Sequence, residues 1–464
     1  MTFAQPSLIK VNKMTIEMDE LKPIREGFGV VEETRKLARI VEIDDVVKHP
    51  NADALELAIV GGWQLCVKMG EYKKGDRAIY CEIDSLLPLD NVKLFGFLES
   101  RRSDNRRVDG KNYHRLKTIK LRKELSQGLL VPIPDEFKDE PVDTNLTLKL
   151  GILKYESAPP MVSKAHAARN APWIVKLGAK LIGNLGGALK PWPEMLTKSD
   201  QDRIQNKTVA FYNLKEDGDD MEVTYKLDGS SMTVFCVDDK GIRTGVCSRN
   251  YELGMGGEKW GFIQQLRYWV GNFLIRNRNL FRKKTWVTPE GKLRNGIILP
   301  LWTKGTAIED NNFVRVTNQQ QIIERLLKFH KNTGRFISVQ GELIGPSIQD
   351  NFEEVADYDY YIFNVYEDGN RELLPAEARA VVKDLGLNYV PVLDPCWKPS
   401  KEMSVKDVLA MAEGPSAFKN KRGYREGLVF KSNQRVLSWK AISTNYLLKK
   451  EKEEEKAAAK EDAV

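Results

Sequence analysis

The sequence predicts a multidomain α+β protein, in which a β-rich N-terminal unit with the form of a small barrel or sandwich precedes a mixed α/β unit. Two observations predict it. Short strand-like runs separated by turn residues recur between residues 37 and 155, whereas strand-like and helical runs alternate after residue 195. The length of 464 residues also accommodates two or three domains, each with its own core.

The composition excludes several classes of protein. With 42% hydrophobic and 30% charged residues, the chain is neither disordered, nor collagen-like, nor a small disulfide scaffold. It has no apolar run long enough for a membrane span or a secretory signal, so we expect no membrane partner. Five widely spaced cysteines are typical of a reducing intracellular compartment, cytoplasm or nucleus. Four scattered histidines indicate that any metal is a hard cation held by carboxylates.

The first unit follows an N-terminal extension, residues 1–34, and covers residues 35–155. Turn residues such as Gly61–Gly62 and Lys74–Asp76 divide it into short β runs. The expected strands are 37–43, 64–68, 77–83, 116–121 and 128–132. A linker rich in Pro and Gly, residues 156–194, comes next, with a short helix expected near Trp173–Leu181.

The second unit is expected over residues 195–447 and contains a basic insertion at about 257–305. Its expected strands are 222–226, 232–237, 336–344, 360–366, 426–431 and 435–441, and its expected helices are 319–331, 375–385 and 405–413. Pro375 and Gly386 mark the two ends of the second helix. The charged tail, residues 448–464, has helical propensity but no apolar stripe, which predicts a frayed, solvated extension.

Positive charge is concentrated in two windows, although the net charge of the chain is only +7. Arg101–Glu124 contains ten Lys/Arg and three Asp/Glu, and Leu274–Gly305 contains eight Lys/Arg and one Glu. Separated basic patches are what a polyanionic partner requires. Two solvated loops are the alternative interpretation of the same charges.

Six short motifs carry the chemistry. The turn Lys226-Leu-Asp228-Gly229 follows a predicted strand, and such a tetrapeptide taken by itself indicates only a turn. Its significance comes from the motifs after it. In order, these are Ser248-Arg249-Asn250, Gln340-Gly341-Glu342, Phe363 within its strand, Glu426-Gly427-Leu-Val429-Phe-Lys431, and Ser438-Trp439-Lys440.

This order and spacing resemble the covalent nucleotidyltransferase superfamily, which contains ATP-dependent DNA and RNA ligases and mRNA capping enzymes. The flanking segments Thr197–Asn206 and Arg115–Leu130 resemble the RNA ligases that carry an OB-fold domain ahead of the nucleotidyltransferase domain. The resemblance covers about residues 35–155 and 195–450. It implies an OB-fold barrel followed by an ATP-grasp-like adenylyltransferase domain. The insertion at about 257–305 has no recognisable counterpart.

The resemblance implies ATP and Mg²⁺ (or Mn²⁺) as cofactors and RNA ligation as the reaction. Lys226 attacks the α-phosphorus of ATP, releases pyrophosphate and holds AMP through a phosphoramide bond. AMP then moves to a 5′-phosphate end, and a 3′-OH displaces it. An RNA strand is expected at the 3′-OH end, because the 2′-OH distinguishes RNA from DNA. The implied substrate is RNA or a nicked duplex, the implied process is RNA repair, and the expected oligomeric state is a monomer.

The same resemblance distributes roles among the motif residues. Glu342, Glu426 and Asp228 hold the metal directly or through water. Lys440 neutralises the α-phosphate, and Lys431 is a second candidate for that contact. Where many relatives carry a lysine two residues before Lys440, this chain has Ser438, so the resemblance does not fix how the phosphate contacts are divided. For the carboxylates, a strand-end salt bridge is the structural alternative.

The remaining candidates bind nucleotide or nucleic acid. Arg249 and Asn250 contact the ribose or the phosphate, and Phe363 stacks on adenine, with an ordinary core phenylalanine as the alternative. Tyr225 and Val429 complete the predicted nucleotide pocket. Four residues are assigned to the polynucleotide: Lys198, Arg203, Phe97 and Arg115.

Two other classes of function stay open at this level. A DNA ligase or a capping guanylyltransferase usually carries its OB domain after the nucleotidyltransferase domain, whereas only a short charged tail follows Lys440 here. A non-catalytic tRNA- or RNA-binding OB protein is the other alternative. The presence of Lys226, Glu342, Glu426 and Lys440 argues against such a catalytically inactive relic.

Overall fold

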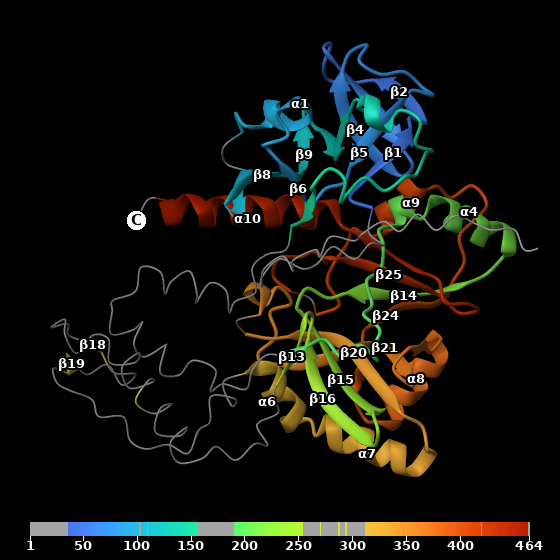
Figure 1. The fold of residues 1–464 in the computed structure, drawn as a ribbon. Helices are drawn as coiled ribbons and strands as arrows, with labels where there is room; N and C mark the ends of the chain where they lie inside the picture. Colours follow the sequence, from blue (N-terminus) through green and yellow to red (C-terminus); the bar gives the residue numbers. More distant parts are fainter. Residues whose placement is uncertain are drawn as a thin grey trace, which may run out of the picture.

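The computed structural model describes residues 36–155 except 102, 103 and 109, residues 190–253, and residues 311–462 except 347 and 419. Between 254 and 310 it describes only 270, 286–287 and 293–294. The predicted N-terminal extension, the linker helix and nearly all of the basic insertion therefore lie outside the described residues. Figure 1 shows two stacked units, with the N-terminal strands above the sheets of the second unit. No helix in the described part of the chain is both long and apolar enough to cross a membrane.

The N-terminal unit consists of short, strongly curved sheets. Along β4, buried residues alternate with more exposed ones, and Trp63, Leu65 and Val67 point into the core. This alternation follows from the two-residue repeat of a strand, which buries one face. Its hydrogen-bond ladders form four separate small sheets across the described residues, so the predicted barrel is not closed by one continuous ladder. The sheets are β1 (Ala38–Glu42) with β5 (Arg77–Cys81) and β11 (Leu129–Val131); β2 (Asp45–Lys48) with β3 (Leu55–Val60) and β4 (Trp63–Lys68); β9 (Thr118–Leu121) with β10 (Glu124–Gln127); and β12 (Leu153–Lys154), β6 (Ser85–Pro88), β8 (Lys111–Arg115) and β7 (Asn105–Val108).

The second unit contains two sheets, and both are largely antiparallel. The smaller sheet has the order β24 (Val392–Trp397), β14 (Met221–Lys226), β25 (Gly427–Ser432) and β26 (Ser438–Ile442). The larger has the order β13 (Lys190–Pro191), β17 (Tyr251–Leu253), β16 (Ile242–Ser248), β15 (Ser230–Asp238), β20 (Ile337–Ile344), β21 (Asp359–Glu367) and β22 (Arg371–Glu372), and β23 (Asn388–Tyr389) pairs in parallel with β21. The chain crosses from one sheet to the other between β14 and β15.

Each sheet has its own helical cover and core. The helices α6 (Asn312–Gln319), α7 (Ile322–Thr333) and α8 (Pro375–Asp384) pack on the larger sheet around Val234, Val339 and Val365. The helices α4 (Thr208–Asp217) and α9 (Val405–Met411) pack on the smaller sheet around Phe211, Phe430 and Trp439. The short helices are α1 (Val92–Phe95), η1 (Gly96–Leu98), η3 (Asp135–Phe137), η5 (Ile204–Asn206) and η7 (Gln349–Asn351).

Three expectations are corrected by the structure. The helix expected at 319–331 begins later, as α7 at Ile322, because Gln321 adopts a left-handed conformation with φ 52°, and the preceding helix α6 was not expected. The second unit begins within the expected linker, since β13 pairs with β17 from Lys190 onward. The charged tail is not a solvated extension over its first turns: α10 (Thr444–Asp462) contacts both units, and Thr118 N donates to Glu451 Oε1 at 3.0 Å.

Polar contacts join the two units next to the segment that precedes α4. Asn206 Oδ1 accepts from Trp63 Nε1 at 2.8 Å and from Arg39 Nη2 at 3.4 Å, and Asn206 Nδ2 donates to Glu82 Oε2 at 2.9 Å. Arg203 Nη2 donates to Asp84 Oδ2 at 3.2 Å. Glycine is needed at position 62, since a Cβ there would lie 2.7 Å from the Cα of Gln205.

Asn206→Ala is expected to destabilise the junction by about 2–3 kcal/mol, because the buried Trp63 N–H and the Glu82 carboxylate each lose a hydrogen bond. The measurement is the free energy of unfolding in denaturant. Asn51→Ala, at an exposed turn of the N-terminal unit, is the control and should change this value little. Equal losses in the two variants would contradict the prediction.

Candidate active site

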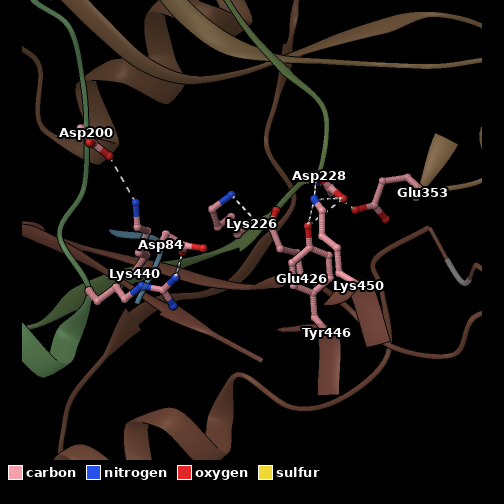
Figure 2. Close-up of polar contacts among 10 residues, drawn as sticks. Asp84, Asp200, Lys226, Asp228, Glu353, Glu426, Lys440, Tyr446 and Lys450 are labelled. Atoms are coloured by element: carbon pink, nitrogen blue, oxygen red, sulfur yellow. Dashed lines mark hydrogen bonds and ion pairs between the residues drawn. The ribbon is translucent and has the colours of Figure 1, made fainter. Parts of the chain in front are cut away.

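The candidate site lies where the chain crosses between the two sheets. Lys226 is the last residue of β14 and is opposite Gly427 in the register with β25. Because Glu426 directly precedes Gly427, its side chain reaches the lysine, and Lys226 Nζ donates to Glu426 Oε1 at 2.7 Å (Figure 2). The pair is only partly shielded on the lysine side: the Lys226 side chain is 27% exposed and that of Glu426 is 10% exposed.

Three carboxylates determine the charge state of the amine. Burial disfavours the ammonium of Lys226, but Glu426 and Glu342, with a smaller contribution from Asp228, outweigh burial and raise the pKa of Lys226. The lysine is therefore an ammonium in the free protein. Its attack on an electrophile requires loss of that proton.

Glu342 joins the site from the larger sheet. It lies on β20, opposite Ser231 of β15, which begins just after the crossing. Burial, with repulsion from Glu426 and Asp228, raises the pKa of Glu342 to about 8, although Lys226 and Arg249 oppose the change. Because burial is the largest cause, Glu342 keeps its proton to a higher pH than an exposed glutamate does.

Gly229 is required by close approach rather than by an unusual φ. A Cβ at this position would overlap Leu343 O and lie 2.9 Å from Glu342 Cγ. Any larger residue therefore pushes the crossing away from β20. This contact explains why a glycine follows the aspartate in the motif.

Gly229→Ala is expected to lower stability by about 1–3 kcal/mol through overpacking and to reduce covalent labelling by ATP, because Glu342 and the turn must separate. The free energy of unfolding and the extent of covalent labelling by ATP are measured for the same variant. Gly218→Ala is the control: it has open space around the new Cβ but φ 72°, so it costs about 1 kcal/mol without an effect on labelling. Unchanged labelling in Gly229→Ala would contradict the prediction.

Asp228 is held by groups that the sequence did not single out. Tyr446 Oη donates to Asp228 Oδ2 at 2.8 Å, and Lys450 Nζ contacts Oδ1 and Oδ2 at 3.4 and 3.3 Å (Figure 2). Its backbone N–H donates to Glu353 Oε1 at 3.5 Å. Burial and the nearby Glu426 raise the pKa of Asp228, and Lys450, Lys226 and the Tyr446 hydroxyl act in the opposite direction. Burial also raises the pKa of Glu353 to about 7.

Figure 2 draws a second polar cluster, which contains Asp200 and Lys440, on the opposite side of Lys226 from Asp228. Asp200 Oδ1 is 3.2 Å from Lys440 Nζ, and Asp200 Oδ2 is 3.8 Å from Arg249 Nη2 and 3.7 Å from Lys154 Nζ of the N-terminal unit. Three cations around one carboxylate form a site that suits phosphate oxygens. The main chain brings them together, because Lys440 N donates to Asp202 O at 2.8 Å and Arg203 pairs with Lys440 in a short parallel bridge.

Two of the residues assigned to the predicted nucleotide pocket belong to one small apolar cluster. Phe363 of β21 and Tyr225 pack with Leu227, Ile344 and Val390, and Phe363 is only partly buried. Val429 is half-buried and opposite Lys440, and Asn250 follows Arg249 at the end of β16. Lys431 instead connects the sheets: its ammonium donates to Phe363 O and to Asn364 Oδ1, and burial lowers its pKa to about 8. Its predicted contact with phosphate stays a prediction.

The four residues assigned to the polynucleotide occupy different environments. Phe97 is 61% exposed on η1, and Lys198 is exposed with its ammonium 5.2 Å from the Trp192 ring centroid. Arg115 and Arg203 are buried at the junction of the units. Arg115 Nη2 is 3.5 Å from Asp84 Oδ1, and its guanidinium lies 3.6 Å from the Tyr155 ring centroid. Both arginines therefore have a structural role at the junction, and RNA contact stays a prediction for all four.

The carboxylates of this site have the oxygen chemistry that suits a hard divalent cation. Glu426 Oε2 is buried and has no hydrogen-bond partner among the described residues. Yet no three His, Cys, Asp or Glu side chains in the described part of the chain converge closely enough to ligate an ion together. Hard cations such as Mg²⁺ retain several waters and accept such sparse protein ligation.

Sequence reasoning missed Asp200, Glu353, Tyr446 and Lys450. Asp200 lies in the segment Thr197–Asn206, between Lys198 and Arg203, which the resemblance assigns to the polynucleotide. The spacing of Tyr446 and Lys450, four residues apart on a helical segment, was a usable signal, because such residues share one helix face.

Comparisons with known proteins agree with this architecture. A family model described as an OB-fold domain matches residues 37–133, and one described as RNA ligase matches residues 292–449. A solved Naegleria gruberi RNA ligase mutant with AMP and Mn is 32% identical, covers 89% of this chain and 99% of its own, and has a TM-score of 0.65. A mutant of that ligase with ATP and Mn is 31% identical, covers 89% of this chain and 99% of its own, and has a TM-score of 0.65. The ligase with PPi is 31% identical, covers 89% of this chain and 98% of its own, and has the same TM-score of 0.65. Curated proteins gave no match.

An OB-fold domain ahead of a two-sheet ligase domain, with a lysine at the crossing between the sheets, defines the class as a polynucleotide-joining enzyme. The chain belongs to the RNA ligase family. The expected fold class and the expected enzyme are confirmed at this level.

Proposed function

We propose that this protein is an ATP- and divalent-metal-dependent RNA ligase that works through a lysine-adenylate on Lys226. The observation that carries the proposal is the Lys226 amine at the crossing between the sheets, 2.7 Å from Glu426 and under the influence of the Glu342 and Asp228 carboxylates. The relatives solved with AMP and Mn, with ATP and Mn, and with PPi support it. ATP is a substrate of the first step, and AMP and pyrophosphate are the groups that this step separates.

The first step forms a P–N bond. The neutral Lys226 amine attacks the α-phosphorus, the bond from that phosphorus to the bridging oxygen breaks, and pyrophosphate leaves. The amine proton passes to the carboxylate cluster or to water. Lys440 and Arg249 release Asp200 and bind phosphate oxygens, so their charge stabilises the transition state. Glu426, Glu342 and Asp228 would hold a divalent cation directly or through water, and such a cation would supply charge neutralisation at the phosphates.

The later steps use the same pocket. The P–N bond breaks when a 5′-phosphate attacks AMP and forms a phosphoanhydride. The 3′-OH then attacks that 5′-phosphorus, its proton leaves and AMP departs. Both are in-line displacements at phosphorus, so positioning and charge stabilisation by the same residues serve each of them. We propose an RNA 3′-OH strand, in RNA or a nicked duplex, a role in RNA repair, and a monomeric enzyme.

Covalent labelling tests the proposal directly. The full chain is incubated with Mg²⁺ and either α-labelled ATP or α-labelled GTP, and then denatured. A label from ATP is expected. A label from GTP alone would indicate capping chemistry, and no label with either nucleotide would indicate a binding module. Nicked duplexes with RNA or DNA at the 3′-OH end then test the substrate, and equal sealing of all-DNA nicks would overturn the RNA preference.

The pH dependence of labelling follows from the raised pKa of Lys226. Below that pKa the neutral amine is the minor form, so the rate is expected to rise about tenfold per pH unit. Glu342→Gln removes one of the charges that raise the pKa of Lys226. The pH profile of its labelling rate is therefore expected to shift to lower pH, even if the maximal labelling rate of the variant is lower. Exposed Glu402→Gln is the control and should leave the profile in place. A flat profile in the unaltered protein would contradict an ammonium at Lys226.

A further inference from the structure

The first turns of α10 contact the aspartate that follows the candidate nucleophile. Tyr446 and Lys450 lie four residues apart on one face of this helix. The Tyr446 hydroxyl donates to one oxygen of Asp228, and the Lys450 ammonium lies within 3.4 Å of both oxygens and also donates to the Tyr446 hydroxyl (Figure 2). The helix thus orients the carboxylate with two donors.

The helix itself is fixed from two sides. Glu451 accepts a hydrogen bond from Thr118 N of the N-terminal unit at 3.0 Å. Arg422 Nη1 lies 3.2 Å from Glu453 Oε2, and the Tyr446 ring meets Phe352 edge-on at 5.2 Å between centroids. Figure 1 shows the helix running along the boundary between the two units. Lys450 and Tyr446 therefore act from a helix whose position is set independently of Asp228.

The backbone of Asp228 is held from a different direction. Its N–H donates to Glu353 Oε1, and Glu353 Oε2 accepts from Ser416 Oγ. A carboxylate has about four acceptor positions, so two donors leave oxygen lone pairs available for a cation or its water. Groups that hold a metal ligand in one orientation in this way affect metal affinity and activity.

We propose that Lys450 and Tyr446 are positioning residues that fix Asp228 for the metal-dependent first step, which makes the first turns of the C-terminal helix a part of the active site. This inference rests on the proposed function. Lys450 and Tyr446 touch neither nucleotide nor RNA in it, and they act only through Asp228.

Adjacent lysines provide a matched comparison. Lys450→Met and Tyr446→Phe are expected to lower the maximal rate constant of Lys226 labelling by about 10–100-fold at saturating ATP and Mg²⁺. Lys449→Met is the control, since Lys449 lies on the same helix with its ammonium 3.9 Å from the Tyr424 ring centroid, away from Asp228. Lys450→Arg keeps the charge and is expected to recover most of the rate.

A second measurement needs neither metal nor nucleotide. The unfolding midpoint is determined for Lys450→Met, for Asp228→Asn and for the double variant. We expect non-additivity: Lys450→Met should lower the midpoint less when Asp228 is already Asn, because the ion pair is absent there. A residue that merely supports the helix would give the same loss in both backgrounds.

The outcomes separate the inference from the function on which it rests. Wild-type labelling rates in Lys450→Met and Tyr446→Phe, or an additive unfolding cycle, would overturn the inference while the unaltered protein still takes label. Failure of the unaltered protein to take label from ATP would overturn the proposed function itself.

Discussion

Lys226→Ala is expected to abolish covalent labelling by ATP and the sealing of ordinary 5′-phosphate ends. The reason is chemical: no other described amine lies against Glu426 at the crossing between the two sheets, and without that amine the P–N bond cannot form. Labelling should fall below the detection limit, since the nucleophile itself is removed. Labelling with α-labelled ATP and sealing of a nicked duplex are the measurements.

A pre-adenylylated nick distinguishes this loss from misfolding. The last step uses a 3′-OH as nucleophile and needs no amine at position 226, so Lys226→Ala should still seal that substrate. Lys383→Ala, an exposed position on α8, is the control for labelling. Persistent labelling in Lys226→Ala would assign the nucleophile elsewhere.

Glu426→Gln is expected to reduce labelling by at least about 10²-fold, the scale seen when one preorganised electrostatic group is removed. Glutamine keeps the size of the side chain but loses the charge that pairs with Lys226 and the buried Oε2 available to a metal-bound water. The measurement is the labelling rate across a range of Mg²⁺ concentrations.

Two features of Glu426→Gln identify the cause of the loss. The pKa of Lys226 should fall, since Glu426 is the largest of the charges that raise it, so the amine becomes neutral more readily. A large drop in rate despite that gain would therefore come from the lost support of the metal. Glu402→Gln, at an exposed position, should behave as the unaltered protein. Normal rates in Glu426→Gln would remove this carboxylate from the mechanism.

Local patterns predicted the elements that carry the site. Alternating, β-branched runs gave the strands that place Lys226, Glu342 and Glu426, and the antiparallel register then brings Lys226 next to Glu426. Pro375 and the residues before Gly386 likewise predicted α8 within a residue. Such features depend on neighbours in sequence or in the next strand, and a sequence reports them well.

Contacts between the two units were not predictable in the same way. Arg115 is 6% exposed and pairs with Asp84 of the same unit, and Asp84 in turn accepts a hydrogen bond from Arg203 of the second unit. The tail lacked an apolar stripe, yet Lys450 and Glu451 reach polar partners in both units. Ion pairs between distant segments leave no periodic signal in the chain, because hydrophobic periodicity reports only apolar burial.

The Asn206 and Arg203 contacts with the N-terminal unit have a consequence for modular dissection of the enzyme. In a fragment that starts at residue 190, Arg203 loses its hydrogen bond to Asp84, and Asn206 loses its hydrogen bonds with Trp63 and Glu82. These residues directly precede the sheets that carry the candidate site. The fragment also leaves Glu451 without Thr118. If such a truncated protein is inactive, the cause can be damage to the second unit as well as loss of RNA binding by the N-terminal unit. Point substitutions on the exposed surface of the N-terminal unit distinguish these two causes.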